Sequence, residues 1–528
     1  GIEVIVTDHH QPPAELPRAV AVVDPHREGC GSGFKDYAGV GVAFKLVCAM
    51  EGDNDTVLEK YGDLVALGTL GDVMPLRGEN RALVRAGLQI LNQGLRPGIR
   101  ALRKIAGVDG HYLNSVSAVF SLVPRINAAG RMVSPDIAAR LLMTTQDVVA
   151  ETLAAEIQEC NSRRQSIECG ILEEIIVRLQ KQPALLADRV IVIGGAGWHP
   201  GVVGIIAARI VERYGKPCIL ISTRDGEGTG SGRSVKGFSL YEAVSSCSDV
   251  LTKFGGHEMA AGLSLPAENI DIFRNRINEY AADKHPRMPV PELQIDFKLR
   301  PSQVDVEKLN LIAALEPFGI GNPQPVFGLF GMRLDNILPV GQGKHLRLSV
   351  SRDDVRLSVI RFNATYDTFP FECGQKVNLV VTLERNEYRG VVTPSLLLRD
   401  IRTETQQEDL IDALHAFDSV MRRDKLSPAD AAAWIPEREQ LERIYKFLRA
   451  KKSWNGSIEQ LCYLLNRPEI PYIRLRLSVE ILRQAGLISI TDKGDMLEIE
   501  LMPADGKADL SKTPVLRHLH SCLGEMSG

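Results

Sequence analysis

The sequence of 528 residues lacks several motifs that would assign it to a common class of protein. Its nine cysteines include no Cys-x-x-Cys pair, which argues against a structural zinc site or a disulfide scaffold and fits a reducing compartment. No apolar stretch approaches the roughly 20 residues of a membrane helix, so we expect no membrane partner. Neither the Gly-x-x-x-x-Gly-Lys-Ser/Thr phosphate loop nor the Gly-x-Ser-x-Gly nucleophile elbow occurs. The Gly-Ala-Gly at residues 195–197 is followed by Pro200 where a dinucleotide-binding motif needs its third glycine.

The sequence also lacks an excess of positive charge. Its 62 Lys and Arg residues and 66 Asp and Glu residues give a net charge of −4, whereas proteins that neutralise phosphates often carry a basic excess. A metal-dependent nuclease gathers carboxylates at its site, so a near-neutral sum is compatible with a local basic groove. Acidic residues concentrate in residues 404–412. The basic residues cluster at Arg77, Arg81, Arg85, Arg96, Arg100 and Arg103.

A short apolar run at residues 2–6 ends in the sequence Thr-Asp-His-His at residues 7–10. Its β-branched residues predict a strand, and open α/β sheets place ligands and catalytic groups at the carboxyl ends of their strands. Asp8, His9 and His10 would then share one strand end, where they could bind a metal ion. A loop with a capping aspartate and two surface histidines is the alternative interpretation.

A second candidate ligand follows a predicted helix. The helix expected over Val57 to Leu70 leads into residues 71–76, where Pro75 ends it and leaves Asp72 at its terminus. A carboxylate at the carboxyl end of a helix is poorly placed for the helix dipole. Because a bound cation would neutralise that charge, Asp72 is a candidate metal ligand.

The order of periodic segments predicts an α/β multidomain protein, and the length fits three or four domains. Residues 291–402 are expected to form an OB-type barrel, which binds single-stranded nucleic acid on its open face. A generic barrel with solvated arginines is the alternative for these residues. A winged-helix-like module could bind DNA or a protein. The expected parts are 1–145, an incomplete parallel-sheet α/β domain; 146–182, a long bridging helix; 183–284, a second α/β domain; 291–402, an OB-like barrel; 403–435, a linker; and 436–528, a winged-helix-like module.

The second α/β domain contains three short motifs that could hold a phosphate. Each joins small residues, which expose backbone N–H groups, to a side chain that can bind an anion. Arg233 can donate to two phosphate oxygens and Ser231 can add a hydroxyl donor. A tight turn at the glycine pair and a core position for His199 are the structural alternatives. The residues of these motifs are His199, Ser231, Gly232, Arg233, Ser234, Gly255, Gly256 and His257.

Several segments together resemble the RecJ exonucleases of the DHH phosphoesterase superfamily. They fall in the order expected for that family, and the resemblance covers residues 1 to about 402, with a weaker one beyond. The segments are Thr-Asp-His-His at 7–10, Gly-Asp-Val-Met-Pro-Leu at 71–76, Glu-Asn-Arg at 79–81, Pro-Arg-Ile-Asn-Ala-Ala-Gly-Arg at 124–131, Ser-Gly-Arg-Ser at 231–234, Gly-Gly-His at 255–257 and Leu-Glu-Pro-Phe-Gly-Ile-Gly-Asn-Pro at 315–323.

The resemblance implies a DHH domain in the first part, a DHHA1-like domain in the second and an OB-like domain that grips the DNA strand. It implies removal of nucleotides from the 5′ end of single-stranded DNA with two divalent cations, Mn²⁺ or Mg²⁺, in DNA repair and recombination. His9 and Asp72 would be metal ligands, and His10 would contact the scissile phosphate. Asp8 would be a further ligand or would support one. Arg125, Asn127 and Arg131 would line the DNA path, and Ser231, Arg233 and His257 would hold the 5′-terminal phosphate.

The family also draws metal-binding aspartates from segments that would precede Gly1. We therefore expect the chain to be N-terminally incomplete and inactive by itself. A DHH phosphoesterase of oligoribonucleotides or cyclic dinucleotides is one alternative, although small substrates need no strand-gripping barrel. A catalytically silent DNA-binding scaffold is the other. Expected partners are single-stranded DNA and a single-strand-binding protein or helicase, for a cytoplasmic monomer.

Overall fold

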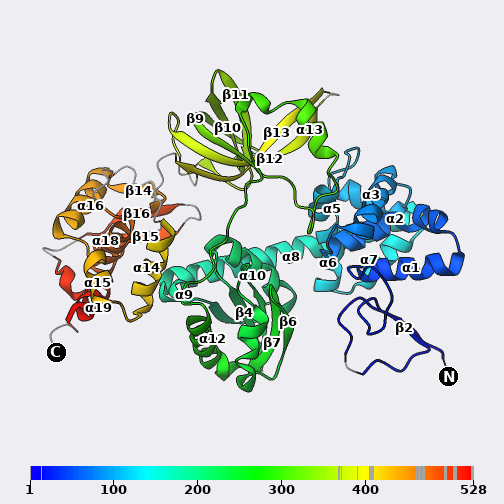
Figure 1. The fold of residues 1–528 in the computed structure, drawn as a ribbon, viewed down its shortest axis with the longest axis horizontal. Coiled ribbons are helices and arrows are strands. Elements are labelled where there is room, and N and C mark those ends of the chain that lie inside the picture. Colours follow the sequence, from blue (N-terminus) through cyan, green and yellow to red (C-terminus); the bar gives the residue numbers. More distant parts are fainter. Residues whose placement is uncertain are drawn as a thin grey trace. The chain divides into compact units, whose positions relative to one another are not determined.

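The computed structural model divides into two compact units. The first contains Gly1–Ile167 and Asp305–Pro325, and the second contains Glu168–Val304 and Val326–Gly528. Figure 1 shows the elements of both units. No helix among the described residues is long and apolar enough to cross a membrane. The structure describes residues 2–13, 15–366, 369, 371–388, 391–403, 410–458, 461, 465, 470–492, 496–503 and 508–524.

The first unit is mostly helical, with one short parallel strand pair. Strands β1 (Ile5–Thr7) and β2 (Ala21–Val23) pair in parallel, so the predicted strand at the start of the chain is confirmed. Helix α2 is capped at its start by Asp53, whose carboxylate accepts hydrogen bonds from the backbone N–H groups of Asp55 and Thr56, and Asp72 directly follows its last residue, as predicted. The helices are α1 (Gly39–Glu51), α2 (Asn54–Gly71), α3 (Gly78–Gln93), α4 (Pro97–Ile105), α5 (Ser115–Ser121), α6 (Val123–Met132), α7 (Asp136–Met143) and α13 (Val306–Ala313).

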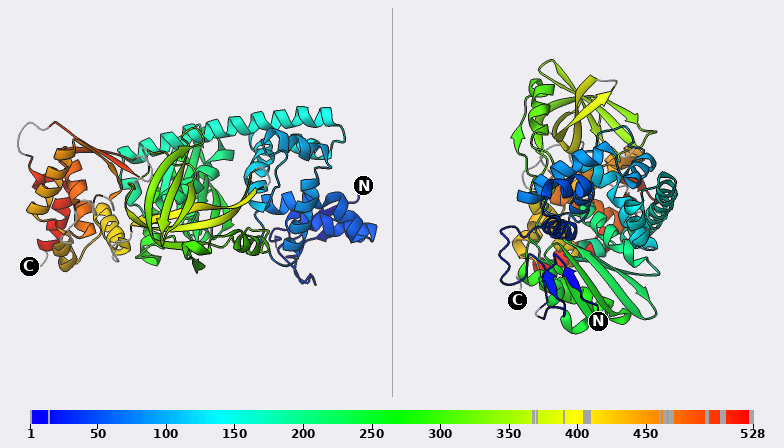
Figure 2. Two further views of the ribbon diagram at one scale, coloured as in Figure 1. Left: turned by 90° about the horizontal axis from the view of Figure 1, so that it is seen from above. Right: turned by 90° about the vertical axis from the view of Figure 1, so that its right-hand side faces the viewer.

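The predicted bridging helix is present as α8 (Asp147–Lys181), a single uninterrupted helix (Figure 2). The boundary between the two compact units falls within it, after Ile167. On its first half, Leu153, Ile157 and Cys160 are buried at helical spacing, which is the pattern that predicted the helix.

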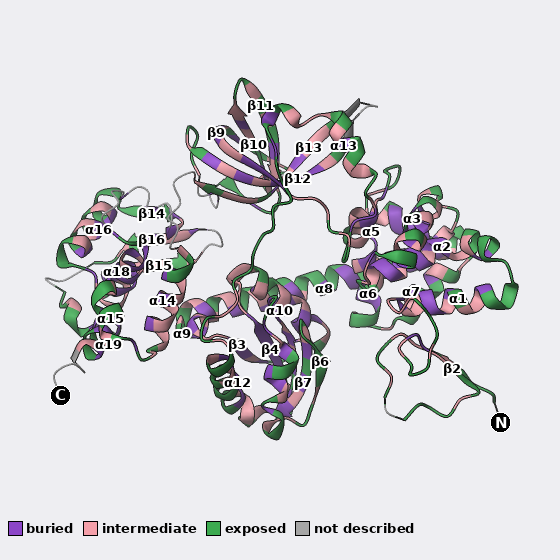
Figure 3. Ribbon diagram, viewed as in Figure 1, coloured by how far each residue is buried: buried purple, intermediate pink, exposed green. Residues whose placement is uncertain are grey.

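The second α/β domain is built on a five-stranded sheet in the order β3-β4-β5-β7-β6. Strands β3 and β4 are parallel and joined through helix α10, and the other neighbours are antiparallel. Both parallel strands are buried along most of their length (Figure 3). The elements are β3 (Ile191–Ala196), β4 (Cys218–Arg224), β5 (Glu227–Arg233), β6 (Lys253–His257), β7 (Ala260–Pro266), α9 (Ala184–Ala187), α10 (Pro200–Tyr214), α11 (Leu240–Ser245) and α12 (Ile270–Lys284).

The predicted OB-like barrel is present as a closed sheet of five strands. The order β10-β11-β13-β12-β9 closes because β9 also pairs with β10, and the short strand β8 extends the edge beside β9. Inward side chains such as Leu348, Val350 and Leu379 are fully buried. The strands are β8 (Phe297–Lys298), β9 (Phe327–Val340), β10 (His345–Arg352), β11 (Val355–Arg361), β12 (Lys376–Tyr388) and β13 (Val391–Thr403).

The C-terminal part has its own apolar core and begins earlier than predicted. The range 403–435 was expected to be a linker, but residues 410–434 form two helices whose Ala413, Val420 and Ala431 lie in that core. A helix, a strand, a further helix and a hairpin follow, and the winged-helix-like interpretation stays a prediction. The elements are α14 (Leu410–Arg422), α15 (Pro428–Trp434), α16 (Arg438–Lys451), β14 (Ser453–Gly456), α18 (Tyr472–Gln484), β15 (Ile488–Asp492), β16 (Leu497–Leu501) and α19 (Pro514–Gly524).

Candidate active site and phosphate cradle

The Asp8–His10 segment follows β1 directly, at the carboxyl end of the strand. Asp8 Oδ1 accepts hydrogen bonds from the backbone N–H of His9 (2.7 Å), the backbone N–H of His10 (3.2 Å) and the Nδ1 of His10 (2.8 Å). The His10 side chain, followed by these backbone donors, lowers the pKa of Asp8 to about 2. Asp8 is therefore a carboxylate at neutral pH, and its bond to Nδ1 leaves the Nε2 of His10 for another partner.

Asp72 approaches the same strand end from the carboxyl end of α2. Its Oδ2 lies 3.3 Å from the Nε2 of His9, although the two residues are distant in sequence. The His9 side chain is 14% exposed and the Asp72 side chain is 45% exposed, so the pair borders solvent. Asp8, His9 and His10 can place one ligand atom each within 4.8 Å of one another. Carboxylate and imidazole donors in this arrangement fit Mn²⁺ or Mg²⁺.

The three residues predicted to line a DNA path all lie on α6. Asn127 and Arg131 are exposed and one helical turn apart, so they share a face. Arg125 is half-buried, and it donates from Nε to Gln158 Oε1 (2.9 Å) and from Nη1 to the carbonyl of Ser121 (2.6 Å). Burial lowers its pKa. Arg125 therefore fastens α6 to α8, and only the other two residues face solvent.

The clustered arginines between residues 77 and 103 are largely engaged inside the first unit. Arg96 forms an ion pair with Asp63 (2.8 Å), and Arg100 forms one with Asp147 (2.5 Å). Arg103 is buried and donates to the backbone carbonyl of His111 (2.9 Å). Their clustering in the sequence thus reflects how this helical unit is held together.

A second site lies on the face of the β5-β7-β6 sheet that α10 packs against. Ser231 pairs across the sheet with Gly262, which pairs with Gly255. In the next row, Arg233 pairs with Ala260, which pairs with His257. Because alternate residues of a strand share a face, these two rows lie on one side of the sheet. A methyl group added at Gly255 would meet nothing within 4 Å, and one at Gly262 only the carbonyl of Gly230 at 4.0 Å, so the floor is open.

Helix α10 closes one side of this floor. A Cβ on its Gly204 would lie 2.7 Å from Ser231 Oγ and 3.4 Å from Arg233 Nη2, so only glycine allows this approach. His199 caps the helix, and its Nδ1 accepts the N–H of Gly201 (3.2 Å). We call the surface formed by Gly204, Ser231, Arg233, Gly255, His257 and Gly262 the phosphate cradle, whereas the only contact described for the predicted phosphate ligand His199 is with its own helix.

Three residues of the predicted phosphate motifs have their own structural roles. Gly232 faces the core, where a Cβ would lie 2.7 Å from Leu240 Cδ2. Ser234 is buried and donates its hydroxyl to the carbonyl of Phe238 (2.7 Å). Gly256 has φ +146° and would clash with the backbone of β7 if it carried a Cβ, so it serves the close approach of two strands. We leave these residues out of the cradle.

Gly204 and Gly262 were not singled out from the sequence. Gly262 follows Ala260 and Ala261, and this run of small residues, two residues after the Gly-Gly-His motif, was a usable signal. Gly204 had no such signal, because its role depends on contact with a strand more than twenty residues later.

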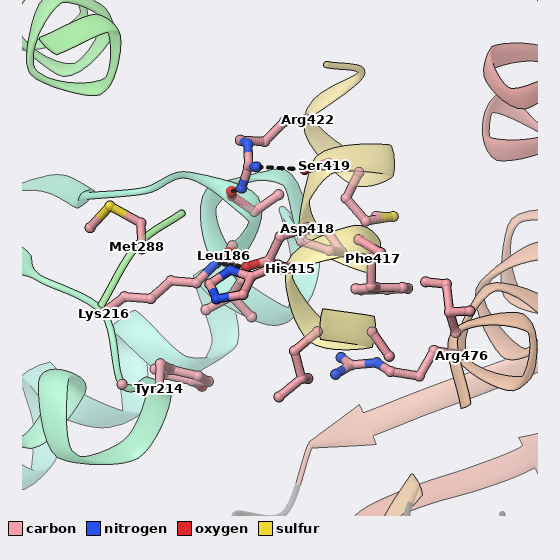
Figure 4. Close-up of a pocket in the computed structure, with 18 of the residues that line it drawn as sticks. Leu186, Tyr214, Lys216, Met288, His415, Phe417, Asp418, Ser419, Arg422 and Arg476 are labelled. Carbon is pink, nitrogen blue, oxygen red and sulfur yellow. Dashed lines mark hydrogen bonds and ion pairs between the residues drawn. The ribbon is translucent and has the colours of Figure 1, made fainter. Parts of the chain in front are cut away.

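A cavity of about 950 Å³ lies within the second unit, between α9–α10 and α14–α18 (Figure 4). Lys216 reaches into it and donates to Asp418 (2.6 Å) and to the carbonyl of Leu186 (2.5 Å). Arg422 donates to Ser419 Oγ (3.1 Å) and to the carbonyl of Ala187. These cations are bound to acceptors of the same chain, so we interpret the cavity as packing space rather than a ligand site.

Comparison with known families supports the domain order. The DHH family, N-terminal domain, matches residues 1–69; the DHHA1 domain matches residues 185–283; and the RecJ OB domain matches residues 295–400. The first and second matches contain Asp8–His10 and the phosphate cradle, respectively.

Whole-chain comparisons identify relatives with one common name, single-stranded-DNA-specific exonuclease RecJ. The protein from Bacillus subtilis (strain 168) is 36% identical over 428 residues, covering 78% of this chain and 54% of the relative. The protein from Escherichia coli (strain K12) is 35% identical over 433 residues, covering 76% and 73%. The crystal structure of RecJ in complex with Mn²⁺ from Thermus thermophilus matches with a TM-score of 0.65 and 33% identity, covering 77% and 59%.

The chain spans about half the length of the Bacillus subtilis relative. It nevertheless carries the three matched domains in order, on elements that place Asp8–His10 and the cradle as described above. On this evidence, the chain belongs to the RecJ family.

Proposed function

We propose that this chain forms the ligand-bearing strand end, the phosphate cradle and the strand-gripping barrel of a 5′ to 3′ exonuclease of single-stranded DNA. The observation that carries the proposal is the convergence of His9 and Asp72, which brings an imidazole and a carboxylate from separate elements to 3.3 Å. The names of the relatives and the Mn²⁺ complex of one of them support the same reaction.

In this proposal, His9 and Asp72 bind a divalent cation, Mn²⁺ or Mg²⁺, and Asp8 supports the site by holding His10 in place. A pair of such ions can activate water and stabilise the oxygen that leaves. The Nε2 of His10 is not bonded to Asp8 and would contact the scissile phosphate. Water adds to phosphorus while the bond to the 3′ oxygen of the terminal nucleotide breaks, which releases a 5′-mononucleotide.

The same bond cleavage leaves a phosphate on the new 5′ end. Arg233 and Ser231 would donate to that phosphate from the sheet, and His257 would contact it from the neighbouring strand. Since every cycle regenerates the group that the cradle recognises, the proposed cradle explains why degradation proceeds from the 5′ end. Asn127 and Arg131 would contact the DNA strand on α6, and the barrel would bind nucleotides farther from the end.

The proposal places the protein in DNA repair and recombination in the cytoplasm, as a monomer. Single-stranded DNA is its substrate, and a single-strand-binding protein or a helicase would supply that substrate. The cysteine pattern and the eight free cysteines among the described residues are consistent with a reducing compartment.

The test is a nuclease assay with the protein as its own gene produces it. Oligonucleotides of one sequence are supplied as single-stranded DNA, duplex DNA and RNA, together with a cyclic dinucleotide, with Mn²⁺ or with EDTA. We expect Mn²⁺-dependent release of mononucleotides from single-stranded DNA alone. Asp72→Asn should abolish this release, while Asp225→Asn, at an exposed turn, should not. Faster cleavage of short RNA or of the cyclic dinucleotide would overturn the proposal in favour of another DHH phosphoesterase.

A further inference from the structure

The segment Leu315–Pro323 supports the family resemblance, but the proposed reaction gives it no role. In sequence it follows α13 and lies between strands β8 and β9 of the barrel. In space it belongs to the first compact unit, because Asp305–Pro325 cluster with Gly1–Ile167. We call residues 315–323 the strap.

The strap is fastened to the first unit by hydrogen bonds to its backbone carbonyls. The backbone N–H of Leu76 donates to the carbonyl of Ile320 at 2.6 Å. The buried hydroxyl of Ser115 donates to the carbonyl of Phe318 at 2.6 Å, and Arg81 Nη2 donates to the carbonyl of Leu315 at 2.7 Å. Leu76 lies in the segment between α2 and α3, Arg81 lies on α3 and Ser115 lies on α5. The strap therefore contacts several elements of the first unit at once.

The strap is also held in shape by hydrogen bonds within itself. The side-chain amide of Asn322 donates to the carbonyls of Leu315 (2.9 Å) and Pro317 (2.8 Å), which closes the segment on itself. Gly319 and Asn322 also exchange backbone hydrogen bonds. The strap therefore presents its carbonyls from a compact loop.

The turn that receives the strap is the one that carries Asp72. After Asp72 the chain passes through Val73 at φ +60°, and the N–H of Met74 returns to the carbonyl of Thr69 (3.2 Å). This is the backbone pattern of a helix end at which glycine is usual, and a β-branched residue rarely adopts it. The turn thus has an unfavourable local conformation and needs support from outside.

That support comes from the two sides of the turn. Asn80 is fully buried, and its amide donates to the carbonyl of Pro75 (3.1 Å) and to that of Asp36. The strap holds the next residue, Leu76, through the bond to Ile320. Leu76 itself is 1% exposed.

We propose that the strap positions Asp72 for metal binding by fixing the turn between Asp72 and Leu76. This inference rests on the proposed function, since it assumes that Asp72 is a ligand. Asp72 contacts the metal, whereas Gly321 and Ser115 act on it only through the turn and are positioning residues.

Two glycines allow the strap to lie this close. A Cβ on Gly319 would lie 2.8 Å from Leu76 Cδ1. Gly321 has φ +77°, and a Cβ there would lie 2.7 Å from Arg77 Nε. Alanine at Gly321 would therefore be strained at φ +77° and would force the Arg77 side chain or the strap to shift, next to the bond between Leu76 and Ile320.

The test compares Gly321→Ala with Gly52→Ala in the protein as its own gene produces it. Gly52 lies in the same unit with φ +70°, but nothing lies within 4 Å of its added Cβ, so it shares the backbone strain without the clash. Mn²⁺ affinity is measured by titration with electron paramagnetic resonance, and the rise in Tm on adding Mn²⁺ is measured in parallel. We expect Gly321→Ala to bind Mn²⁺ about tenfold more weakly and to show a smaller Mn²⁺-induced rise. Gly52→Ala should match the parent in both. Equal Mn²⁺ affinities for the two variants would overturn the inference.

A second pair covers the case in which Gly321→Ala does not fold. Ser115→Ala removes the hydrogen bond to the strap, while Ser117→Ala on the same helix removes one to Asn114, within the start of that helix. Only Ser115→Ala should weaken Mn²⁺ binding. Where activity is measured at fixed Mn²⁺, kcat should fall and KM for DNA should stay unchanged.

Asp72→Asn in the same Mn²⁺ titration distinguishes failure of the proposed metal site from failure of the inference about the strap. If Asp72→Asn binds Mn²⁺ as tightly as the parent, Asp72 is no ligand, and both the proposed site and the inference fail. If Asp72→Asn loses Mn²⁺ while Gly321→Ala and Ser115→Ala retain it, the inference alone fails.

Discussion

The phosphate cradle and the His9–Asp72 pair are held in place by different kinds of structure. The cradle takes Ser231, Arg233 and His257 from hydrogen-bonded strands, above a core that includes Leu263 and Leu265. His9 instead follows a three-residue strand, and Asp72 lies in a turn after a helix. Strand register fixes the first set of side chains, whereas the second depends on contacts from other segments.

This difference indicates where each site is vulnerable. In the cradle, the positions of the side chains follow from pairing that the whole sheet enforces, so a change should affect the contact removed and little else. At the His9–Asp72 pair, a change in a supporting segment should lower the affinity of the proposed site for Mn²⁺. Substitutions at the His9–Asp72 pair should therefore change metal binding and hydrolysis, whereas substitutions in the cradle should change the preference for a 5′-phosphorylated strand.

The largest effect should come from Asp72→Asn. Removing a charged ligand should lower metal-dependent hydrolysis by about two to three orders of magnitude, because each tenfold needs only about 1.4 kcal/mol. The discrimination between 5′-phosphoryl and 5′-hydroxyl ends in a binding assay should not change. Turnover like that of the parent at saturating Mn²⁺ would show that Asp72 is not a ligand.

Arg233→Ala should lower the preference for a 5′-phosphorylated strand and leave Mn²⁺ affinity unchanged. Loss of a charge-assisted hydrogen bond costs about 1.5–3 kcal/mol, which is about 10- to 150-fold in preference for a 5′-phosphorylated strand. Competition between phosphorylated and hydroxyl-ended oligonucleotides measures this ratio, and Mn²⁺ affinity serves as the control. If the affinities for both oligonucleotides fall by the same factor, or if only Tm falls, Arg233 has a structural role and the 5′ end is recognised elsewhere.

Gly255→Val tests the open floor of the cradle. The new side chain meets no atom within 4 Å at its Cβ, and valine suits a strand, so Tm should be retained. It occupies the space that we assign to the phosphate, so affinity for a 5′-phosphorylated strand should fall about tenfold, as for the loss of one charged contact. The same affinity as the parent would place the phosphate away from this floor.

The smallest effect should come from Ser231→Ala. A single neutral hydroxyl contributes about 1 kcal/mol to a contact, so the preference for a 5′-phosphate should fall about fivefold. Thr at this position keeps the hydroxyl and is the matched control. No difference between Ala and Thr would leave Arg233 as the main determinant of end recognition.

The sequence predicted the elements that depend on local periodicity. The bridging helix was expected over 146–182 and runs over Asp147–Lys181, since apolar residues recur at helical spacing and no breaker occurs before Pro183. Asp72 was expected at a helix end because Pro75 cannot continue a helix, and it is the residue that follows α2.

Other features carried a signal that was not used. Alternation along β5 separates Ser231 and Arg233 from Gly232, so the inward orientation of Gly232 could have been foreseen. The acidic residues before α14 led to a linker prediction, although Ala413, Ala416 and Val420 recur at helical spacing. The contact between Leu76 and Ile320 had no local signal at all, because it joins segments far apart in the sequence.

The strap gives the first unit a discontinuous sequence, and this has a consequence for how the protein is made. Domains generally fold as they emerge from the ribosome, N-terminal parts first. Helices α1–α7 can pack early, but the turn after Asp72 lacks the carbonyl of Ile320 until the second α/β domain and β8 have been synthesised. We therefore expect a nascent chain that stops before residue 305 to contain a folded helical unit with an unfinished metal-binding turn.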